Sequence, residues 1–356
     1  MSAPVLVMAG GTGGHVFPGL AVADALRLRD VPVVWLGAEG GMEQRLVPKR
    51  GIAFESIRIG GIRGKGWKRA LQAPFELLSA VLQARRILRR LQPRSVLSLG
   101  GYAAGPGGLA AWWIGRPLLV HEQNSIPGLT NRVLARLARE VLTGFPDAFR
   151  RRGRWVGNPV RQEIVDLPAP SIRFAGRNGR ARLLVMGGSL GARALNRMLP
   201  AALALLPEAE RPEVIHQCGE KHIAEAQAAY AEHAVHARVV AFIDNMGEAY
   251  GWADLAVCRA GALTLAELTA AGLGALLVPF PSAVDDHQTA NARWLCLVGG
   301  AELMPESTLT HTGLSERLRS LLADRPRLLA MAEQARAQAQ VNAAETVAQA
   351  CIEMAA

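Results

Sequence analysis

The residues with the clearest chemical potential form a glycine-rich run near the N-terminus, A-G-G-T-G-G-H, which ends on His15. It follows the apolar run 5–8 and precedes a helix-like stretch, 16–28. Glycines that open a helix let backbone N–H groups approach an anion, with the positive end of the helix dipole behind them. An imidazole titrates near neutrality, so His15 is a candidate general base. A residue that caps or positions the loop is the alternative for the same histidine.

Two further segments have the same character. V-M-A-G-G-T-G-G at 7–14 recurs as V-M-G-G-S-L-G-A at 185–192, and two such loops in matching places favour phosphate binding. The stretch R-A-G-A-L-T-L-A-E at 259–267 also follows a strand and begins a helix. Thr264 can donate to a phosphate oxygen, and Glu267 can accept both hydroxyls of a ribose. The alternative for Glu267 is a carboxylate that only satisfies the helix dipole.

Several common site types are absent from the sequence. The dinucleotide fingerprint fails because Val16 replaces its third glycine, and no phosphate-loop signature G-x-x-x-x-G-K-[ST] occurs. There is no D-x-D, since Asp285 and Asp286 are adjacent, and the pair His233 and His236 lacks an accompanying carboxylate pattern. We therefore expect no metal and no cofactor. Backbone donors, helix dipoles and Arg161 are the expected stabilisers of a leaving diphosphate.

The elements that position these residues alternate between short apolar strands and helical stretches. Strands are expected at 5–8, 31–36, 96–99, 117–120 and 141–143, and again at 183–186, 214–217, 239–242, 255–258 and 275–279. Buried strands separated by helices predict parallel sheets covered on both faces. We expect an α/β protein of two Rossmann-like domains, 1–158 and 159–340, with a C-terminal helix at 341–356 near the interdomain region.

Length and composition agree with this organisation. A chain of 356 residues, half of them apolar, is long enough for two domains. The four cysteines form no C-x-x-C pair, which indicates a reducing compartment. No signal peptide is recognisable. The uncharged stretch 95–115 has the length of a membrane span, but its glycines and proline favour a strand, a turn and a short helix of a soluble protein.

The positive charge is concentrated in the first half. Residues 1–160 contain 23 Lys+Arg and 9 Asp+Glu, whereas the remainder contains 17 and 21. Ten basic residues and one acid lie between Arg58 and Arg94, interleaved with apolar residues such as Ile62, Trp67 and Phe75. Such a segment can lie in the headgroup region of an anionic bilayer. The alternative is an ordinary amphipathic helix, which leaves the excess of arginine unexplained.

Taken together, these motifs resemble those of a known family. G-G-T-G-G-H, G-G-Y-A-A-G-P at 100–106, H-E-Q-N at 121–124, G-N-P-V-R at 157–161, G-G-S-L-G-A and C-R-A-G-A-L-T-L-A-E occur in the order typical of the MurG family of bacterial glycosyltransferases. The resemblance spans residues 5 to about 292. It implies a GT-B fold with the active site in the cleft between the domains. It also implies inverting transfer of N-acetylglucosamine (GlcNAc) from UDP-GlcNAc to the C4 hydroxyl of N-acetylmuramic acid in lipid I, forming lipid II for peptidoglycan.

The resemblance also assigns residues. For the base, the chemistry of the imidazole makes His15 the first choice. His121 and Glu122 are rivals because H-E-Q-N is expected at the carboxyl end of another strand, and Glu122 is retained beside His15 as a catalytic candidate. Donor contacts are implied at Thr12, Gly13, Gly14, Asn124, Arg161, Ser189, Ile243, Ala262, Leu263, Thr264, Leu265, Ala266, Glu267 and Gln288. Ala266 stands where some members have serine, which removes one hydroxyl donor, and the unusual stretch 281–287 lets the alignment of Gln288 slip.

The implied setting is the cytoplasmic face of the bacterial inner membrane, with peripheral attachment. The implied partners are UDP-GlcNAc, lipid I, an anionic membrane surface and other proteins of cell-wall synthesis, and no nucleic acid. A UDP-sugar 2-epimerase of similar fold is the main alternative, although it needs no basic membrane face. A non-catalytic protein that binds an anionic ligand such as RNA explains the charge but leaves the glycine loops unused.

Overall fold

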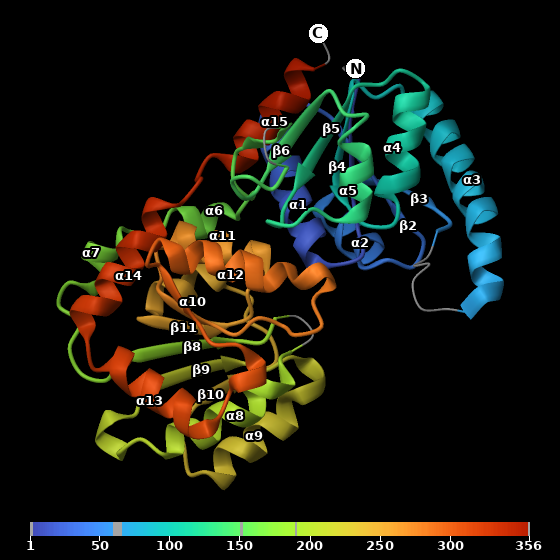
Figure 1. Cartoon of the computed structure of the whole chain (residues 1–356). Helices are drawn as coiled ribbons and strands as arrows, with labels where there is room; N and C mark the ends of the chain where they lie inside the picture. Colours follow the sequence, from blue (N-terminus) through green and yellow to red (C-terminus); the bar gives the residue numbers. More distant parts are fainter. Residues whose placement is uncertain (1–2, 60–65, 150–151, 189–190, 355–356) are drawn as a thin grey trace. The chain divides into compact units, whose positions relative to one another are not determined.

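The computed structural model describes residues 3–59, 66–149, 152–188 and 191–354. The chain divides into two compact units: unit 1 comprises Met1–Val160 and Gln340–Ala356, and unit 2 comprises Arg161–Ala339. Each unit carries one parallel sheet covered by helices (Figure 1). The expected α/β fold of two Rossmann-like domains is therefore confirmed.

The sheet of unit 1 has the order β3-β2-β1-β4-β5-β6-β7 and is parallel throughout. Its central strands are buried along their whole length, as expected of a sheet covered on both faces. The strands are β1 (Val5–Ala9), β2 (Val33–Ala38), β3 (Ala53–Ile57), β4 (Ser95–Gly100), β5 (Leu118–Glu122), β6 (Glu140–Thr143) and β7 (Arg154–Trp155).

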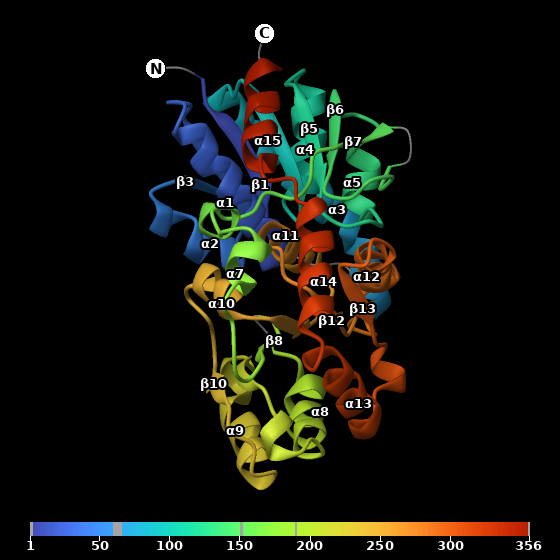
Figure 2. The same cartoon turned by 90° about the vertical axis from the view of Figure 1, so that its left-hand side faces the viewer.

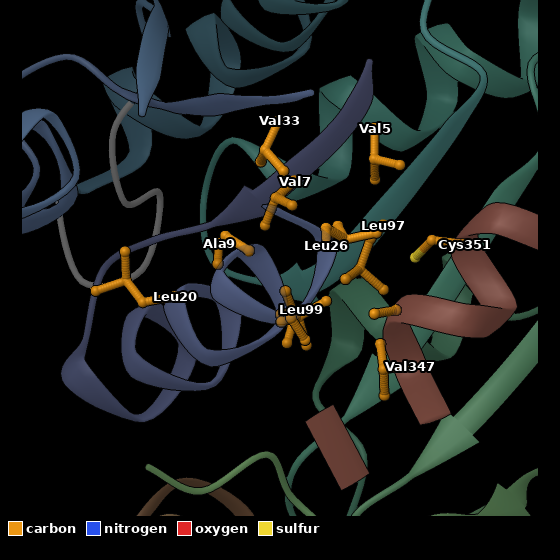
Figure 3. Close-up of a cluster of buried hydrophobic side chains, with 14 of the residues drawn as sticks. Val5, Val7, Ala9, Leu20, Leu26, Val33, Leu97, Leu99, Val347 and Cys351 are labelled. Carbon is orange, nitrogen blue, oxygen red and sulfur yellow. The ribbon is translucent and has the colours of Figure 1, made fainter. Parts of the chain in front are cut away.

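Alternate residues of β1 enter two different cores, because successive side chains of a strand point to opposite faces. Val5, Val7 and Ala9 belong to one hydrophobic cluster, which Figure 3 shows together with Leu26 and Val347. Leu6 and Met8 belong to the other, with residues of α3 and α4. The helices of unit 1 are α1 (Gly13–Arg27), α2 (Met42–Leu46), η1 (Pro48–Arg50), α3 (Gly66–Leu91), α4 (Ala104–Trp113), α5 (Leu129–Leu134) and α15 (Ala343–Glu353).

The C-terminal helix α15 completes unit 1 rather than standing apart. It packs on α1, and Val347 and Cys351 are fully buried in the same cluster as β1 (Figures 2 and 3). The carbonyl of Cys351 accepts a 2.7 Å hydrogen bond from the hydroxyl of Ser95 on β4. The end of the chain thus covers one face of the first sheet, which its sequence position did not indicate.

The sheet of unit 2 has the order β10-β9-β8-β11-β12-β13 and is also parallel. Its strands are β8 (Arg182–Met186), β9 (Glu213–Gln217), β10 (Arg238–Val240), β11 (Leu255–Cys258), β12 (Ala275–Leu277) and β13 (Ala301–Leu303). Apolar residues of α8, α13 and α14 pack with those of β8 and β11 in one cluster. The helices are α6 (Gln162–Val165), α7 (Pro170–Phe174), α8 (Arg193–Ala204), η3 (Glu208–Glu210), η4 (Glu220–His222), α9 (Ile223–Glu232), α10 (Met246–Trp252), α11 (Ala262–Ala271), η5 (Val284–Asp286), α12 (His287–Leu297), η6 (Glu306–Thr308), α13 (His311–Leu322) and α14 (Arg325–Ala337).

Within the described residues, no helix combines the length and the apolar character that a membrane crossing requires. The stretch 95–115 forms β4, a glycine turn and α4, as its glycines indicated.

Candidate active site

The glycine loop of unit 1 leaves the carboxyl end of β1 and enters α1. Gly11 has a φ of +85°, a conformation that favours glycine, and Thr12 is the N-cap of α1 without a side-chain capping bond. The loop lies directly against the glycine turn that follows β4. Gly10 N donates to Gly100 O at 3.3 Å, and a Cβ on Gly101 would lie 2.4 Å from Gly10 O. Bare backbone is therefore required at Gly101.

His15 lies in the first turn of α1 and folds back over the loop. Its Nδ1 is 3.1 Å from the carbonyl oxygen of Gly10 and 3.4 Å from the hydroxyl of Thr12. A carbonyl can only accept, so Nδ1 carries a proton and the lone pair of the neutral ring is on Nε2. Nε2 faces Gly100, where an added Cβ would lie 3.1 Å away. The side chain is partly exposed, as a base that meets a substrate must be.

The carboxylate of Glu122, at the end of β5, organises the loop that follows it. It accepts the backbone N–H and the side-chain amide of Asn124 at 2.9 and 3.2 Å. It also accepts the N–H of Gly128 at 3.2 Å and the amide of Asn131 at 2.9 Å. Glu122 is 2 % exposed, so this geometry favours a role in positioning the Asn124 loop over direct proton transfer.

His121 is completely buried and its two ring nitrogens are both engaged. Nε2 donates to Gly157 O at 2.9 Å, and the amide of Gln123 lies 3.1 Å from Nδ1. Burial lowers the pKa of His121 to about 4, only partly offset by the bond to the Gly157 carbonyl. A buried neutral imidazole with both nitrogens engaged has no route to a substrate hydroxyl, so the geometry disfavours His121 as the base.

Unit 2 presents the N-terminus of α11 at the end of β11. Gly261 is the N-cap in extended conformation and carries no side chain, and the hydroxyl of Thr264 lies close to it. One turn further, Glu267 is 8 % exposed. The amides of a first turn that has no side-chain cap, with a threonine hydroxyl beside them, form a site suited to a phosphate.

Glu267 belongs to a polar cluster that ties three segments of unit 2 together. One carboxylate oxygen lies 3.2 Å from Arg161 Nη2, and the other accepts the hydroxyl of Tyr250 at 3.0 Å. Arg161 also pairs with Glu163 at 3.1 Å. Burial raises the pKa of Glu267, while the charge of Arg161 and the Tyr250 hydroxyl oppose the rise. Each oxygen still has a lone pair for a further donor.

Comparisons with known proteins identify the family of this chain. The glycosyltransferase family 28 N-terminal domain matches residues 5–143, and the family 28 C-terminal domain matches 182–347. A curated relative from Alkalilimnicola ehrlichii is 56 % identical over 99 % of both chains. A relative from Xanthomonas campestris pv. campestris is 58 % identical over 97 % of this chain and 80 % of its own. Both are named UDP-N-acetylglucosamine–N-acetylmuramyl-(pentapeptide) pyrophosphoryl-undecaprenol N-acetylglucosamine transferase.

The crystal structure of Acinetobacter baumannii MurG superimposes with a TM-score of 0.88 at 40 % identity, covering 99 % of this chain and 100 % of its own. The chain belongs to the MurG family. The kitacinnamycin glycosyltransferase, at 15 % identity and a TM-score of 0.72, shares the fold alone. The expected family and GT-B fold are therefore confirmed, and the epimerase and the non-catalytic binding protein find no support.

The residues of the MurG-family motifs lie in both units of the structure. Thr12 is the N-cap of α1, Gly13 and Gly14 lie in its first turn, and Asn124 follows β5 in unit 1. Ser189 lies outside the described residues. Gly188 before it and Gly191 two positions after it both have a positive φ. Arg161 and the remaining predicted contacts belong to unit 2.

Within unit 2, the MurG-family contacts differ in their exposure. Ala262 and Leu265 are buried in α11, whereas Leu263, Thr264 and Ala266 are partly exposed. Leu265 is 0 % exposed, so its side chain has no surface for a donor. Ile243 is partly exposed after β10, and the side-chain oxygen of Gln288 accepts the N–H of Phe280 at 2.9 Å.

Sequence reasoning missed three residues that hold these loops in place. Glu43 accepts the N–H of Gly11 at 3.2 Å, Asn131 donates to Glu122, and Tyr250 donates to Glu267. None of the three lies in a glycine motif or at a recognisable spacing from one. Their roles arise from side chains that tertiary packing brings to the loops, which no local sequence signal announces.

Proposed function

We propose that this chain transfers GlcNAc from UDP-GlcNAc to the C4 hydroxyl of N-acetylmuramic acid in lipid I, with inversion at the anomeric carbon. The near full-length identity to transferases of this name carries the proposal. The site chemistry supports it, because one unit offers a partly exposed imidazole beside a glycine loop and the other offers a helix N-terminus beside a carboxylate.

In this proposal, His15 is the general base. Nε2 takes the proton of the C4 hydroxyl while the hydroxyl oxygen bonds to the anomeric carbon. The bond from that carbon to the diphosphate breaks, and UDP leaves with the electron pair. The Nδ1–H bond to the Gly10 carbonyl supports this role, since it leaves the lone pair on Nε2. Glu122 serves as a positioning residue for Asn124 rather than as a second base.

The uridine diphosphate part of the donor is assigned to unit 2, and the predicted contacts Thr12, Gly13, Gly14 and Asn124 of unit 1 are assigned to the rest of the donor. The first turn of α11 and Thr264 receive the diphosphate, and Glu267 accepts the ribose hydroxyls. Arg161, already beside Glu267, supplies a positive charge to the leaving group. The sequence has no D-x-D, so stabilisation by backbone donors and Arg161 is proposed in place of a bound metal.

Peripheral attachment to the cytoplasmic face of the inner membrane is proposed for unit 1. Large apolar side chains stand exposed on α3 and α4: Phe75 is 76 % exposed, Leu78 55 %, Trp112 57 % and Trp113 52 %. The guanidinium of Arg85 lies 4.3 Å from the ring centre of Trp113. Exposed aromatic residues among arginines suit the interface of an anionic bilayer. Ile62 and Lys65, which belong to the predicted basic segment from Arg58 to Arg94, lie outside the described residues.

The deciding experiment measures UDP release by the purified protein. Release is expected only when UDP-GlcNAc and a lipid I analogue are both present, and it is expected to persist in excess EDTA. Release without an acceptor, or conversion of UDP-GlcNAc to its C2 epimer, contradicts the proposed reaction. Loss of activity in EDTA with rescue by Mg²⁺ or Mn²⁺ contradicts metal independence alone.

A further inference from the structure

The carboxylate of Glu43 is completely buried beside the glycine loop of unit 1. Glu43 comes from the short helix α2, which follows β2. Its Oε2 accepts the N–H of Gly11 at 3.2 Å, and its Oε1 accepts the N–H of Ala38 at 3.0 Å. Burial of a carboxylate is costly unless its oxygens are hydrogen-bonded, so these two contacts fix its position closely.

Glycines make the room for this carboxyl group. A Cβ on Gly10 would lie 2.3 Å from Glu43 Oε1, and one on Gly41 would lie 2.4 Å from the same atom. A Cβ on Gly37 would lie 2.7 Å from Glu43 Cγ. Side chains at any of these positions would displace the carboxylate. The bare backbone at Gly10 is therefore required by Glu43.

The two hydrogen bonds on either side of this loop meet at a single peptide group. The N–H of Gly11, held by Glu43, and the C=O of Gly10, which accepts from His15 Nδ1 at 3.1 Å, belong to the same planar unit. Because the N–H and C=O of a trans peptide point in opposite directions, fixing one fixes the other. Glu43 thereby directs a carbonyl acceptor at His15 Nδ1.

We propose that Glu43 is a positioning residue for the transfer reaction, which holds the Gly10–Gly11 peptide so that His15 keeps its proton on Nδ1 and its lone pair on Nε2. The catalytic role of Glu43 rests on the proposed function of His15. The orientation of the Gly10–Gly11 peptide by Glu43 does not. In Glu43→Gln, an NH₂ group faces one of the two backbone N–H donors, so one of the contacts is lost. The amide oxygen is expected to keep the shorter, buried contact to Ala38, so the NH₂ group faces Gly11 N–H. The peptide is then free to turn and His15 loses its fixed acceptor.

The test is NMR of protein carrying ¹⁵N-labelled histidine, at a pH where His15 is neutral, with its signals assigned by their loss in His15→Ala. The wild-type protein is expected to show the Nδ1–H form of His15, and Glu43→Gln a shift toward the Nε2–H form. Glu39→Gln is the matched control, because Glu39 is an exposed acid of the same segment that pairs with Arg58. It is expected to leave the His15 signals unchanged.

Turnover provides the second readout. Glu43→Gln is expected to lower kcat by about 10-fold or more in the wild-type background but by less than about 2-fold in His15→Ala, because Glu43 acts through the imidazole. A purely structural role predicts equal losses in both backgrounds and contradicts the proposal.

The wild-type spectrum keeps the inference testable if Glu43→Gln fails to fold. An Nε2–H tautomer in the wild-type protein, or an unchanged tautomer in a folded Glu43→Gln variant, overturns it. If His15 is not the base, the His15→Ala variant is expected to keep a near-normal kcat, which distinguishes that failure from the failure of the Glu43 proposal.

Discussion

His15 is the residue on which the proposed chemistry depends most directly. His15→Ala is expected to lower kcat by about 10²-fold or more with donor Kd nearly unchanged, because a base acts in the transition state and not in donor binding. The acid limb of kcat/KM against pH, which reports the base of the free enzyme, is expected to flatten. His236→Ala, a change at an exposed histidine, serves as the control.

Near-normal kcat with poor donor binding in His15→Ala would instead make His15 a loop-positioning residue. The base would then have to be sought at His121 or Glu122, either of which would have to leave its buried, hydrogen-bonded position.

Glu267 gives a second prediction at the residue scale. Glu267→Ala removes a carboxylate proposed to accept the ribose hydroxyls, and hydrogen bonds to a charged group contribute ~1.5–3 kcal/mol each. A donor lacking the 2′-hydroxyl is expected to bind more weakly than UDP-GlcNAc to the wild type, but hardly more weakly to Glu267→Ala. Tyr250→Phe is the control for the cluster, because it removes only the hydroxyl that donates to Glu267. An equal loss of affinity in wild type and Glu267→Ala would show that Glu267 does not hold the hydroxyl.

The residues that the sequence could indicate are those carried by local motifs. The glycines of the β1 loop, His15 and the start of α11 at Ala262 follow directly from strand, turn and helix signals. The ion pair of Arg161 with Glu267, 106 positions apart, and the contact of Glu43 with Gly11 have no such signal. They depend on packing between distant segments, so only the structure could supply them.

At the scale of elements, the sequence located the central strands of both sheets and the edge strand β10, and missed the other three edge strands. Each predicted strand overlaps a strand of the structure, because continuous apolar runs are typical of parallel strands covered on both faces. β3, β7 and β13 were not predicted. β3 and β7 contain exposed positions, β13 has only three residues, and all three are edge strands, so their patterns lack a long apolar run.

The prediction about membrane binding concerns helices α3 and α4. Replacing Lys65, Lys68, Arg69, Arg85 and Arg86 by Gln is expected to weaken binding to anionic vesicles, and raised salt is expected to weaken binding of the wild type, because surface attraction is screened. Turnover of a short-chain soluble acceptor is expected to survive. Co-sedimentation with vesicles of defined anionic content measures the binding.

A charge-matched comparison separates this surface from net charge. Arg85→Gln with Arg86→Gln and Arg29→Gln with Arg45→Gln remove the same charge, but only the first pair lies on α3. The first pair is expected to lose more binding than the second. Equal binding by both pairs would count against the α3–α4 surface.

At the scale of the whole molecule, each unit contains one completely buried imidazole, and both imidazoles make folding depend on pH. His216 in unit 2 lies between Tyr230 and Asn196, with ring nitrogens 3.0 and 3.1 Å from their oxygens. Burial lowers the pKa of His216 to about 4, as it does for His121 in unit 1. Both units therefore fold with a neutral histidine in the core.

The sign of the effect follows from the direction of these shifts. A folded-state pKa below the ordinary 6.5 means that protons bind the unfolded chain more tightly. The stabilisation is complete above pH 6.5 and is lost as the pH falls toward 4. At pH 5 each histidine is expected to cost ~2 kcal/mol of unfolding free energy relative to pH 7.5.

His121→Gln and His216→Gln are each expected to be less stable than the wild type at pH 7.5. Between pH 7.5 and pH 5, each variant is expected to lose ~2 kcal/mol less unfolding free energy than the wild type loses. Urea unfolding at both pH values measures this, with exposed His236→Gln expected to follow the wild type. A loss in either buried variant equal to that of the wild type would mean that its histidine is not held neutral in the folded chain.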